Sequence, residues 1–286
     1  MMTASHTCRV LVLAMTATVF GGCGSKTATE TPKGAEKSGE DDGEGGGGDE
    51  GEGGGGDGKF LVRYDEAADS DNGAWRDALM EVNYLEAIAT EFNKKINLPR
   101  DVTFVGKECG EENAFFDSAT SEVQMCYEYM IFIQRLVAES TIAKPEGMDD
   151  DQIVNDAITA VLLHELGHAL IYVLDLPITG KEEDVADQIS AYYLISNGLS
   201  TTVLNSAYVW ALIADGEDTS QLFWDTHSLS SQRYANNVCW VFGADPDGQA
   251  SWVDDGTIDA DRAASCQGEY EKMAQAIEAI MAPHLK

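Results

Sequence analysis

One long apolar helix that carries two histidines constrains the fold of this chain more than any other feature. Residues 157–175 are almost all apolar, yet they include His164 and His168. Apolar residues surround both histidines at helical spacing, which predicts a helix that is largely buried. Asp149 supplies a signal for the helix start, and Pro177 marks its end. Because a buried imidazole without a partner is costly, the fold must give both histidines a partner.

The spacing of the histidines predicts what this partner is. Residues four apart lie on the same face of a helix, so His164 and His168 can bind one metal ion together. Glu165 stands beside the first histidine, where a carboxylate can take a proton from a water molecule. This arrangement is typical of Zn²⁺ sites in zinc-dependent peptidases. We therefore predict one zinc ion per chain, with Glu165 as the general base.

A catalytic zinc site needs a third protein ligand. Thr179 and Glu182 form a capping-box pattern, which predicts that Glu182 is used at the start of a second helix. Glu183 and Asp187 then lie four apart on one face of that helix. We predict Glu183 as the third ligand and Asp187 as a hydrogen-bond partner of His164, with Asp187 as the alternative ligand. An ordinary solvated helix start is the other interpretation of these acids.

The two predicted helices resemble a known clan of peptidases. A His-Glu-x-x-His helix followed by a helix with Glu-x-x-x-Asp is similar to the gluzincins, the thermolysin-like zinc peptidases. The form Glu-x-x-Ala-Asp also resembles the membrane-associated zinc peptidases of the CAAX-processing type. Glu183 lies fifteen positions after His168, closer than in thermolysin, so the connection must be tight. This departure keeps Asp187 open as the ligand, as in the aspzincins.

A closer resemblance covers nearly all of the chain after residue 58. The segments that carry it are HELGHALIYVLDLPITGKEEDVADQIS, DTHS, VCW and RAASC with the later EY and APHL. They resemble an uncharacterised bacterial family described as metallopeptidases. The resemblance implies the class of the protein and gives no substrate.

Hydrolysis of a peptide bond also needs a group that stabilises the oxyanion. A histidine on a later helix does this in thermolysin-like enzymes, and the resemblance points to His227 as a catalytic residue, with Asp225 as its orienting partner. Helix capping by Asp225 or Ser228, with His227 merely exposed, is an equal alternative. Tyr172 and Tyr234 are further candidate donors.

The order of the predicted elements favours an α+β domain. Strands come first and helices later, so we expect an N-terminal mixed sheet, the metal-binding helix and a mainly helical C-terminal part. This is the zincin-like fold that the resemblance implies, in which an edge strand binds extended peptide. Asn113 and Ala114, followed by Phe115, resemble the edge strand of thermolysin, although an ordinary edge strand fits as well. The predicted strands are 60–64, 101–105 and a hairpin over 114–125 that turns at 117–118, and the predicted helices are 75–96, 127–139, 201–214, 219–224, 229–242 and 258–281.

The pattern of the first 58 residues indicates that the protein is exported. Residues 1–22 have the apolar centre of a signal peptide, which is too short to span a membrane. Cys23 follows small residues as a lipidated cysteine does, although Phe20 departs from the lipobox pattern. Residues 23–58 are rich in Gly, Asp and Glu, and predict a disordered linker. We expect a bacterial cell-envelope lipoprotein, at the outer membrane or surface, with plain secretion as the alternative.

The remaining domain, residues 59–286, is strongly acidic. Ten of the 50 acids and four of the 18 Lys or Arg residues precede it, which leaves 40 acids against 14 cations. This charge argues against nucleic acid and anionic membrane surfaces as partners. We expect a peptide or protein substrate, and membrane contact only through the N-terminal lipid. The acidic stretches 245–247 and 254–255 lack the spacing of a known calcium loop, so calcium is an unsupported second candidate.

Four of the six cysteines belong to this domain. An even number in an exported chain predicts two disulfides, with three pairings open. We predict the local pairs, Cys109–Cys126 and Cys239–Cys266, with free buried thiols as the alternative.

Two classes of function fit these patterns. The first is an exported, lipid-anchored zinc metalloendopeptidase. The second is a non-catalytic surface lipoprotein that binds zinc for structure. Glu165 favours the first class, because a structural zinc site has no use for a base beside its ligand.

Overall fold

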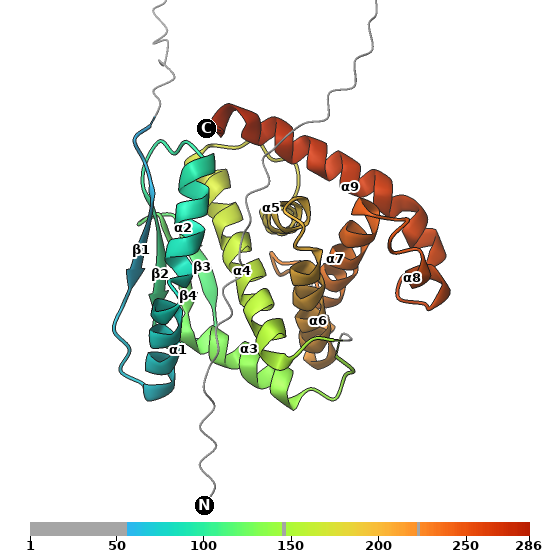
Figure 1. The fold of residues 1–286 in the computed structure, drawn as a ribbon, viewed down its shortest axis with the longest axis horizontal. Helices are drawn as coiled ribbons and strands as arrows, with labels where there is room; N and C mark the ends of the chain where they lie inside the picture. The colour runs from blue at the N-terminus through green and yellow to red at the C-terminus, as the bar shows by residue number, and fades with distance from the viewer. Residues whose placement is uncertain (1–55, 145–146, 222–223) are drawn as a thin grey trace, which may run out of the picture.

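The computed structural model describes residues 56–144, 147–221 and 224–286. The predicted signal peptide, the lipidation site at Cys23 and nearly all of the predicted linker lie outside these residues. Within the described residues, every strand lies before residue 127, although two helices separate the first strand from the second, and the part that follows is mainly helical (Figure 1). The fold is therefore α+β, with a small mixed sheet and a mainly helical C-terminal part, as predicted.

Four strands form one sheet in the order β1-β2-β4-β3. Their bounds are β1 Phe60–Tyr64, β2 Val102–Lys107, β3 Ala114–Asp117 and β4 Glu122–Cys126. The first three neighbours, β1, β2 and β4, run parallel, whereas β3 pairs antiparallel with β4. β3 is thus the edge strand of the described sheet. The predicted hairpin is present, but its turn follows Asp117 instead of including it, because Asp117 still pairs with Glu122.

The helices are α1 Ser70–Glu81, α2 Tyr84–Lys95, α3 Tyr127–Glu139, α4 Asp150–Val173, α5 Glu182–Ser196, α6 Ser200–Gly216, α7 Ser230–Ala244, α8 Ser251–Asp254 and α9 Ala260–Met281, with short 3-10 turns η1 Thr219–Gln221 and η2 Ala282–His284. α4 lies between the sheet and the later helices, where it contacts β3 and β4 as well as α5 and α6 (Figure 1). α7 packs against α6 and α9. The helix that carries both histidines is therefore the centre of the fold.

α4 begins and is covered as its sequence predicts. The carboxylate of Asp149 caps it by accepting the backbone N–H of Gln152 at 2.8 Å. Nearly every side chain from Ile153 to Val173 is buried, because the sheet and the helices cover the helix on all sides. In the described part of the chain, α4 alone is long and apolar enough to cross a membrane, but 89% of its most apolar window is buried inside the protein. That burial is the property of a core helix.

Two predicted helices differ from the observed ones. The helix predicted over 75–96 is two helices, α1 and α2, of which the first already begins at Ser70. Asn83 separates them with a φ of 53°, a left-handed conformation that Asn adopts more readily than most residues. The predicted helix 219–224 is, in its described part, only the short η1 turn. Thr219 and Ser220 there are exposed, so the turn has no apolar face to bury.

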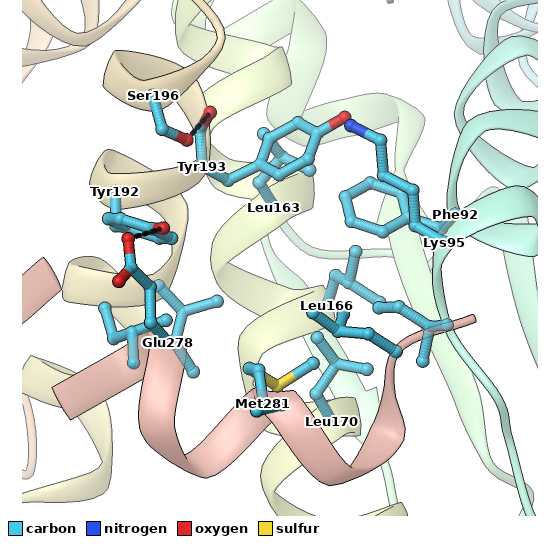
Figure 2. Close-up of a pocket in the computed structure, with 15 residues that line it drawn as sticks. Phe92, Lys95, Leu163, Leu166, Leu170, Tyr192, Tyr193, Ser196, Glu278 and Met281 are labelled. Atoms are coloured by element: carbon cyan, nitrogen blue, oxygen red, sulfur yellow. Dashed lines mark hydrogen bonds between the residues drawn. The ribbon is translucent and has the colours of Figure 1, made fainter. Parts of the chain in front are cut away.

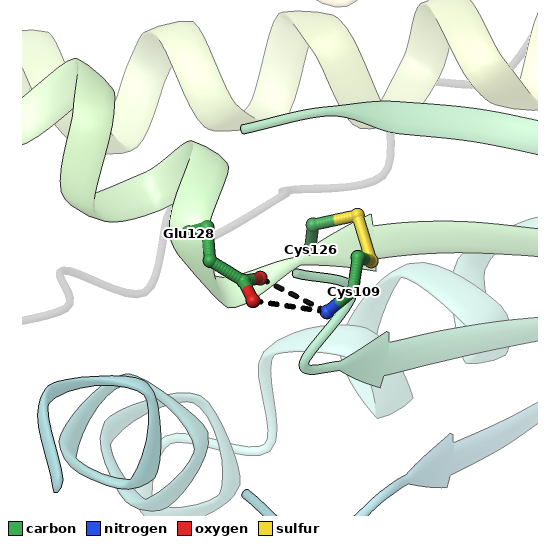
Figure 3. Close-up of side chains that lie close together, drawn as sticks. All are labelled: Cys109, Cys126 and Glu128. Atoms are coloured by element: carbon green, nitrogen blue, oxygen red, sulfur yellow. Dashed lines mark hydrogen bonds between the residues drawn. A yellow bond between two sulfur atoms is a disulfide. The ribbon is translucent and has the colours of Figure 1, made fainter. Parts of the chain in front are cut away.

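Both predicted disulfides are present in the structure. Cys109–Cys126 joins the loop after β2 to the end of β4, and Cys239–Cys266 joins α7 to α9. Figure 3 shows the first disulfide beside Glu128, whose carboxylate accepts the backbone N–H of Cys109. Cys109, Cys126 and Glu128 lie close enough together to suggest a metal site. Both sulfurs are held in the disulfide, however, so the two cysteines have no thiolate to offer a metal ion.

Replacing both cysteines of either pair by serine is expected to lower the free energy of unfolding by about 3 kcal/mol, because the bonds close chain segments with sequence separations of 17 and 27 residues. Urea unfolding measures this change. A reducing agent should lower the unfolding free energy of the natural chain. It should not change the unfolding free energy of a variant in which both pairs have been replaced. Equal unfolding free energies with and without the pairs would contradict the expectation.

An apolar cavity of about 450 Å³ lies beside α4. Figure 2 shows lining residues from several helices, among them Phe92 of α2, Leu166 of α4 and Met281 of α9. At one end the ammonium of Lys95 lies 5.0 Å from the centre of the Tyr193 ring. No residue that lines this cavity also lines the cleft described below. The cavity is therefore separate from the histidine-bearing site.

Candidate metal centre

α4 and α5 carry three groups whose donor atoms converge. His164 and His168 lie one turn apart on α4, and Glu183 lies in the first turn of α5. The Nε2 atoms of the two histidines are 3.2 Å apart. Oε2 of Glu183 lies 3.2 Å from Nε2 of His164 and 3.3 Å from Nε2 of His168. The structure thus brings the three residues predicted as ligands into a nearly equilateral triangle of donor atoms.

The size of this triangle fits a zinc ion. Donor atoms about 2.0–2.1 Å from a tetrahedral Zn²⁺ lie about 3.3–3.4 Å apart. The observed separations are 3.2–3.3 Å. The donors are two imidazole nitrogens and a carboxylate oxygen, the set that catalytic zinc sites use. The residues present therefore fit the metal ion.

A carboxylate fixes the outer nitrogen of each histidine. Nδ1 of His164 donates to Oδ1 of Asp187 at 2.7 Å, and Nδ1 of His168 donates to Oε1 of Glu182 at 2.7 Å. With the proton on Nδ1, each imidazole directs the lone pair of Nε2 toward the centre. Asp187 therefore lies behind His164, while Glu183 lies at the centre itself.

The capping box predicted for the start of α5 is wrong. The residue before the helix is Lys181, and no side chain caps the N-terminus of the helix. Glu182, which the pattern assigned to the cap, accepts the Nδ1–H of His168 instead. A mostly buried imidazole N–H needs an acceptor, and α5 approaches α4 closely enough for Glu182 to provide it.

Glu165 is buried beside the triangle of donor atoms, with only 7% of the residue exposed. Its Oε1 lies 4.0 Å from Nε2 of His164. Burial raises the pKa of the Glu165 carboxyl, and the neighbouring His164 and His168 oppose this only in part. A carboxylate with a raised pKa is suited to accept a proton near neutral pH.

The carboxylates also change the pKa of the histidines. Burial lowers the pKa of His168, but its hydrogen bonds to Glu183 and Glu182 outweigh burial and raise the pKa to about 9. The pKa of His164 is raised in the same way, because hydrogen bonds to Asp187 and Glu183 outweigh its burial. Burial opposes ionisation of Glu183, yet the imidazoles of His164, His168 and His227 next to its carboxylate lower its pKa strongly. The centre therefore attracts a cation, either a proton or a metal ion.

His227 reaches the centre from the loop before α7. Its Nε2 lies 3.1 Å from Oε2 of Glu183, and its Nδ1 lies 3.1 Å from Oδ1 of Asp225. The His227 side chain is half exposed, at 50%. The hydrogen bond to Glu183 raises the pKa of His227. The structure therefore places His227 and its expected partner Asp225 beside Glu183. Potential ligand atoms of His227, His164 and Glu183 all lie within 4.8 Å of one another, so His227 is a further candidate ligand.

A cleft of about 880 Å³ leads to these groups. Its lining includes Ala114, which belongs to the edge strand β3, and Asn113, which directly precedes that strand. α4 contributes Tyr172, and the loop 225–227 lines the cleft as well. Tyr234 is not among the residues that line it. Of the two tyrosines considered as donors, the structure thus brings Tyr172 to the cleft.

Gly167 sets how closely α5 approaches α4. A Cβ atom at this position would lie 3.0 Å from Cα of Ala186 and 3.2 Å from its Cβ. Glycine therefore allows a separation of the two helices that a larger residue would have to increase. Glu183 and Asp187 lie on the same helix as Ala186 and within one turn of it. The contact between Gly167 and Ala186 therefore also sets the distance of both carboxylates from the histidines.

The variant Gly167→Ala is expected to push α5 away from α4, to weaken zinc binding and to cost about 1–3 kcal/mol of stability through overpacking. Urea unfolding and competition with a chelator measure the two effects. Gly73→Ala is the matched control, since a Cβ at that helical position meets nothing within 4 Å. The control should gain about 0.5–1 kcal/mol. Equal effects of the two variants would contradict the role of Gly167.

Sequence patterns missed the part that two residues play at the centre. They assigned Glu182 to a helix cap instead of to His168, and they gave no indication of Arg233. Arg233 of α7 is 7% exposed and donates to Asp187, 46 positions earlier in the chain. The sequence shows only a single arginine within a predicted helix. Nothing in its spacing indicates which acid it pairs with.

The fold and the site together define a class: an α+β protein with a His–His–Glu centre suited to a metal ion. Residues 64–281 match the family DUF4344, whose description is "Putative metallopeptidase". The chain belongs to this family. No curated protein and no solved structure matches it. The family gives the class of metallopeptidases, and the gluzincin assignment stays a prediction.

Proposed function

We propose that this protein is a zinc-dependent endopeptidase of the gluzincin type. The observation that carries the proposal is the triangle of donor atoms from His164, His168 and Glu183, with the buried carboxylate of Glu165 beside it and a cleft leading to both. A zinc site that served structure alone would have no use for a buried base such as Glu165 beside its ligands. The non-catalytic alternative therefore has less support.

The residues of the centre divide the work of peptide hydrolysis. Bound zinc supplies a Lewis acid that polarises the scissile carbonyl and lowers the pKa of water. Glu165 takes the proton of the attacking water and passes it to the leaving amine. His227, whose half-exposed imidazole lies beside Glu183, donates a hydrogen bond to the oxyanion that develops on the carbonyl oxygen.

The edge strand β3 is the proposed docking site for substrate. It ends the described sheet and lines the cleft through Ala114, with Asn113 just before it. An extended peptide that adds to such an edge gains affinity from main-chain hydrogen bonds, whatever its side chains are. This position of β3 next to the centre also supports the zincin-like assignment of the fold.

Zinc content and cleavage products test this function. Elemental analysis of the purified protein should give one zinc per chain. A library of synthetic peptides, analysed by mass spectrometry, should show cleavage at internal bonds that stops with a zinc chelator and returns with added zinc. Absence of zinc from protein refolded in its presence would contradict the metal site, and trimming from the ends alone would contradict the endopeptidase assignment.

The cellular location is a separate part of the proposal. We propose export and a lipid anchor on Cys23, supported by the apolar N-terminal segment and the small residues before this cysteine. Labelling of cells with radioactive palmitate should mark the natural chain and leave Cys23→Ser unmarked. Equal labelling of both chains would contradict the anchor.

A further inference from the structure

Arg233 is held in place by an aromatic ring and by burial. It lies on α7, and its guanidinium carbon is 3.6 Å from the centre of the Trp210 ring on α6. Only 7% of the residue is exposed. A planar guanidinium stacked at this distance on an indole has little freedom to turn, so its N–H groups point in fixed directions.

The N–H groups of Arg233 donate hydrogen bonds to both oxygens of the Asp187 carboxylate. Nε of Arg233 donates to Oδ2 at 2.7 Å, and a terminal nitrogen donates to Oδ1 at 2.5 Å. A two-point contact between guanidinium and carboxylate fixes the plane of the carboxylate as well as its position. Oδ1, held in this way, is the atom that accepts the Nδ1–H of His164 at 2.7 Å.

We propose that Arg233 is a positioning residue of the metal centre, acting through Asp187 on the imidazole of His164. The chain of contacts runs from Trp210 to Arg233, then to Asp187 and His164, and ends at Nε2, one corner of the donor triangle. This inference rests on the proposed zinc site. It adds that the orientation of one ligand is set from α6 and α7, which supply none of the three ligands.

The other ligand histidine offers a comparison within the same centre. Glu182, the acceptor for His168, has a side chain that is 51% exposed, whereas the side chain of Asp187 is 14% exposed. Water can replace an exposed acceptor, but a buried carboxylate depends on its protein partners for orientation. His164 is therefore the ligand whose position relies on a support outside α4 and α5.

The affinity for zinc and the spectrum of bound Co²⁺ test this role without any measurement of activity. Arg233→Met removes the charge and both donors, and Arg233→Lys keeps the charge but cannot make the two-point contact. We expect zinc to bind Arg233→Met about tenfold or more weakly, as measured by competition with a coloured chelator. Arg233→Lys should recover part of the affinity. The visible spectrum of bound Co²⁺ should change in both variants, because it reports the ligand geometry.

Arg262→Lys is the matched control. Arg262 makes a similar two-point contact, with Glu269 on the surface of α9, so its replacement should change neither affinity nor spectrum. If Arg233→Met does not fold, Arg233→Lys decides the question, since it retains the buried charge. A folded Arg233→Lys with the affinity and spectrum of the natural protein would overturn the inference while leaving the zinc site intact. Natural protein that binds no zinc would overturn the proposed function together with the inference.

Discussion

Glu165→Gln is expected to lower the rate of peptide hydrolysis by about 10³-fold, because general base catalysis contributes about 10²- to 10⁴-fold. Glutamine keeps the shape of the side chain but cannot accept the proton of the attacking water. Glu165 is buried next to His164, so no solvent-borne base has easy access to the same position. The rate is measured with a peptide that the natural protein cleaves, at saturating zinc.

The zinc content of Glu165→Gln separates catalysis from metal binding. Oε1 of Glu165 lies 4.0 Å from Nε2 of His164 and is outside the donor triangle, so one zinc per chain should remain bound. Unfolding by urea should occur near the concentration observed for the natural protein. A variant that keeps its zinc and also keeps its rate would exclude Glu165 as the base and favour a non-catalytic metal protein.

Glu183→Ala is expected to weaken zinc binding by about 10²-fold or more. Four ligands of a structural zinc site contribute about 10–16 kcal/mol together, or about 3 kcal/mol each, and about 1.4 kcal/mol corresponds to a factor of ten. Oε2 of Glu183 is the one carboxylate oxygen that lies within 3.3 Å of both ligand nitrogens among the described residues. Competition with a chelator of known affinity measures the loss.

Asp187→Asn provides the comparison for the third ligand. Asp187 contacts the outer nitrogen of His164 and not the donor triangle, so its replacement should weaken zinc binding by about 10- to 100-fold, less than loss of a ligand. Elemental analysis should therefore find zinc in Asp187→Asn under conditions that strip Glu183→Ala. The reverse order would make Asp187 the ligand and place the protein with the aspzincin type.

The helix that carries His164 and His168 could be predicted because its information is local. Apolar periodicity, the cap at Asp149 and the four-residue spacing of His164 and His168 all lie within one helix, where spacing translates directly into geometry. The hairpin of β3 and β4 and the two disulfides were predictable for a similar reason, since their partners are close in sequence.

The role of Glu182 shows where local patterns fail. A capping box is a preference of an isolated helix start, worth about 0.5–2 kcal/mol. In the folded protein the same carboxylate satisfies the Nδ1–H of His168, and tertiary contact overrides the local preference. No spacing rule relates the first residue of one helix to the outer nitrogen of a histidine on the helix before it.

Arg233 shows a second limit. It lies on α7, far from Glu183 in the chain, and it meets the centre only because α7 packs against α5 and α6. His227, just before α7, was indicated by the resemblance and not by spacing. The helix itself was predictable from periodicity. Which way it faces α5 depends on packing between helices, and a single sequence does not carry that information in any short window.

The apolar cavity beside α4 contributes to the response of the protein to hydrostatic pressure. Any part of this space that water does not fill is lost when the chain unfolds, so pressure favours the unfolded state. Leu163, which lines this cavity, directly precedes His164 in the chain. Compression therefore acts on the helix that carries both histidines, and the proposed zinc ion, which would join that helix to α5, would oppose unfolding. We expect the pressure at which the protein unfolds to rise when zinc is bound.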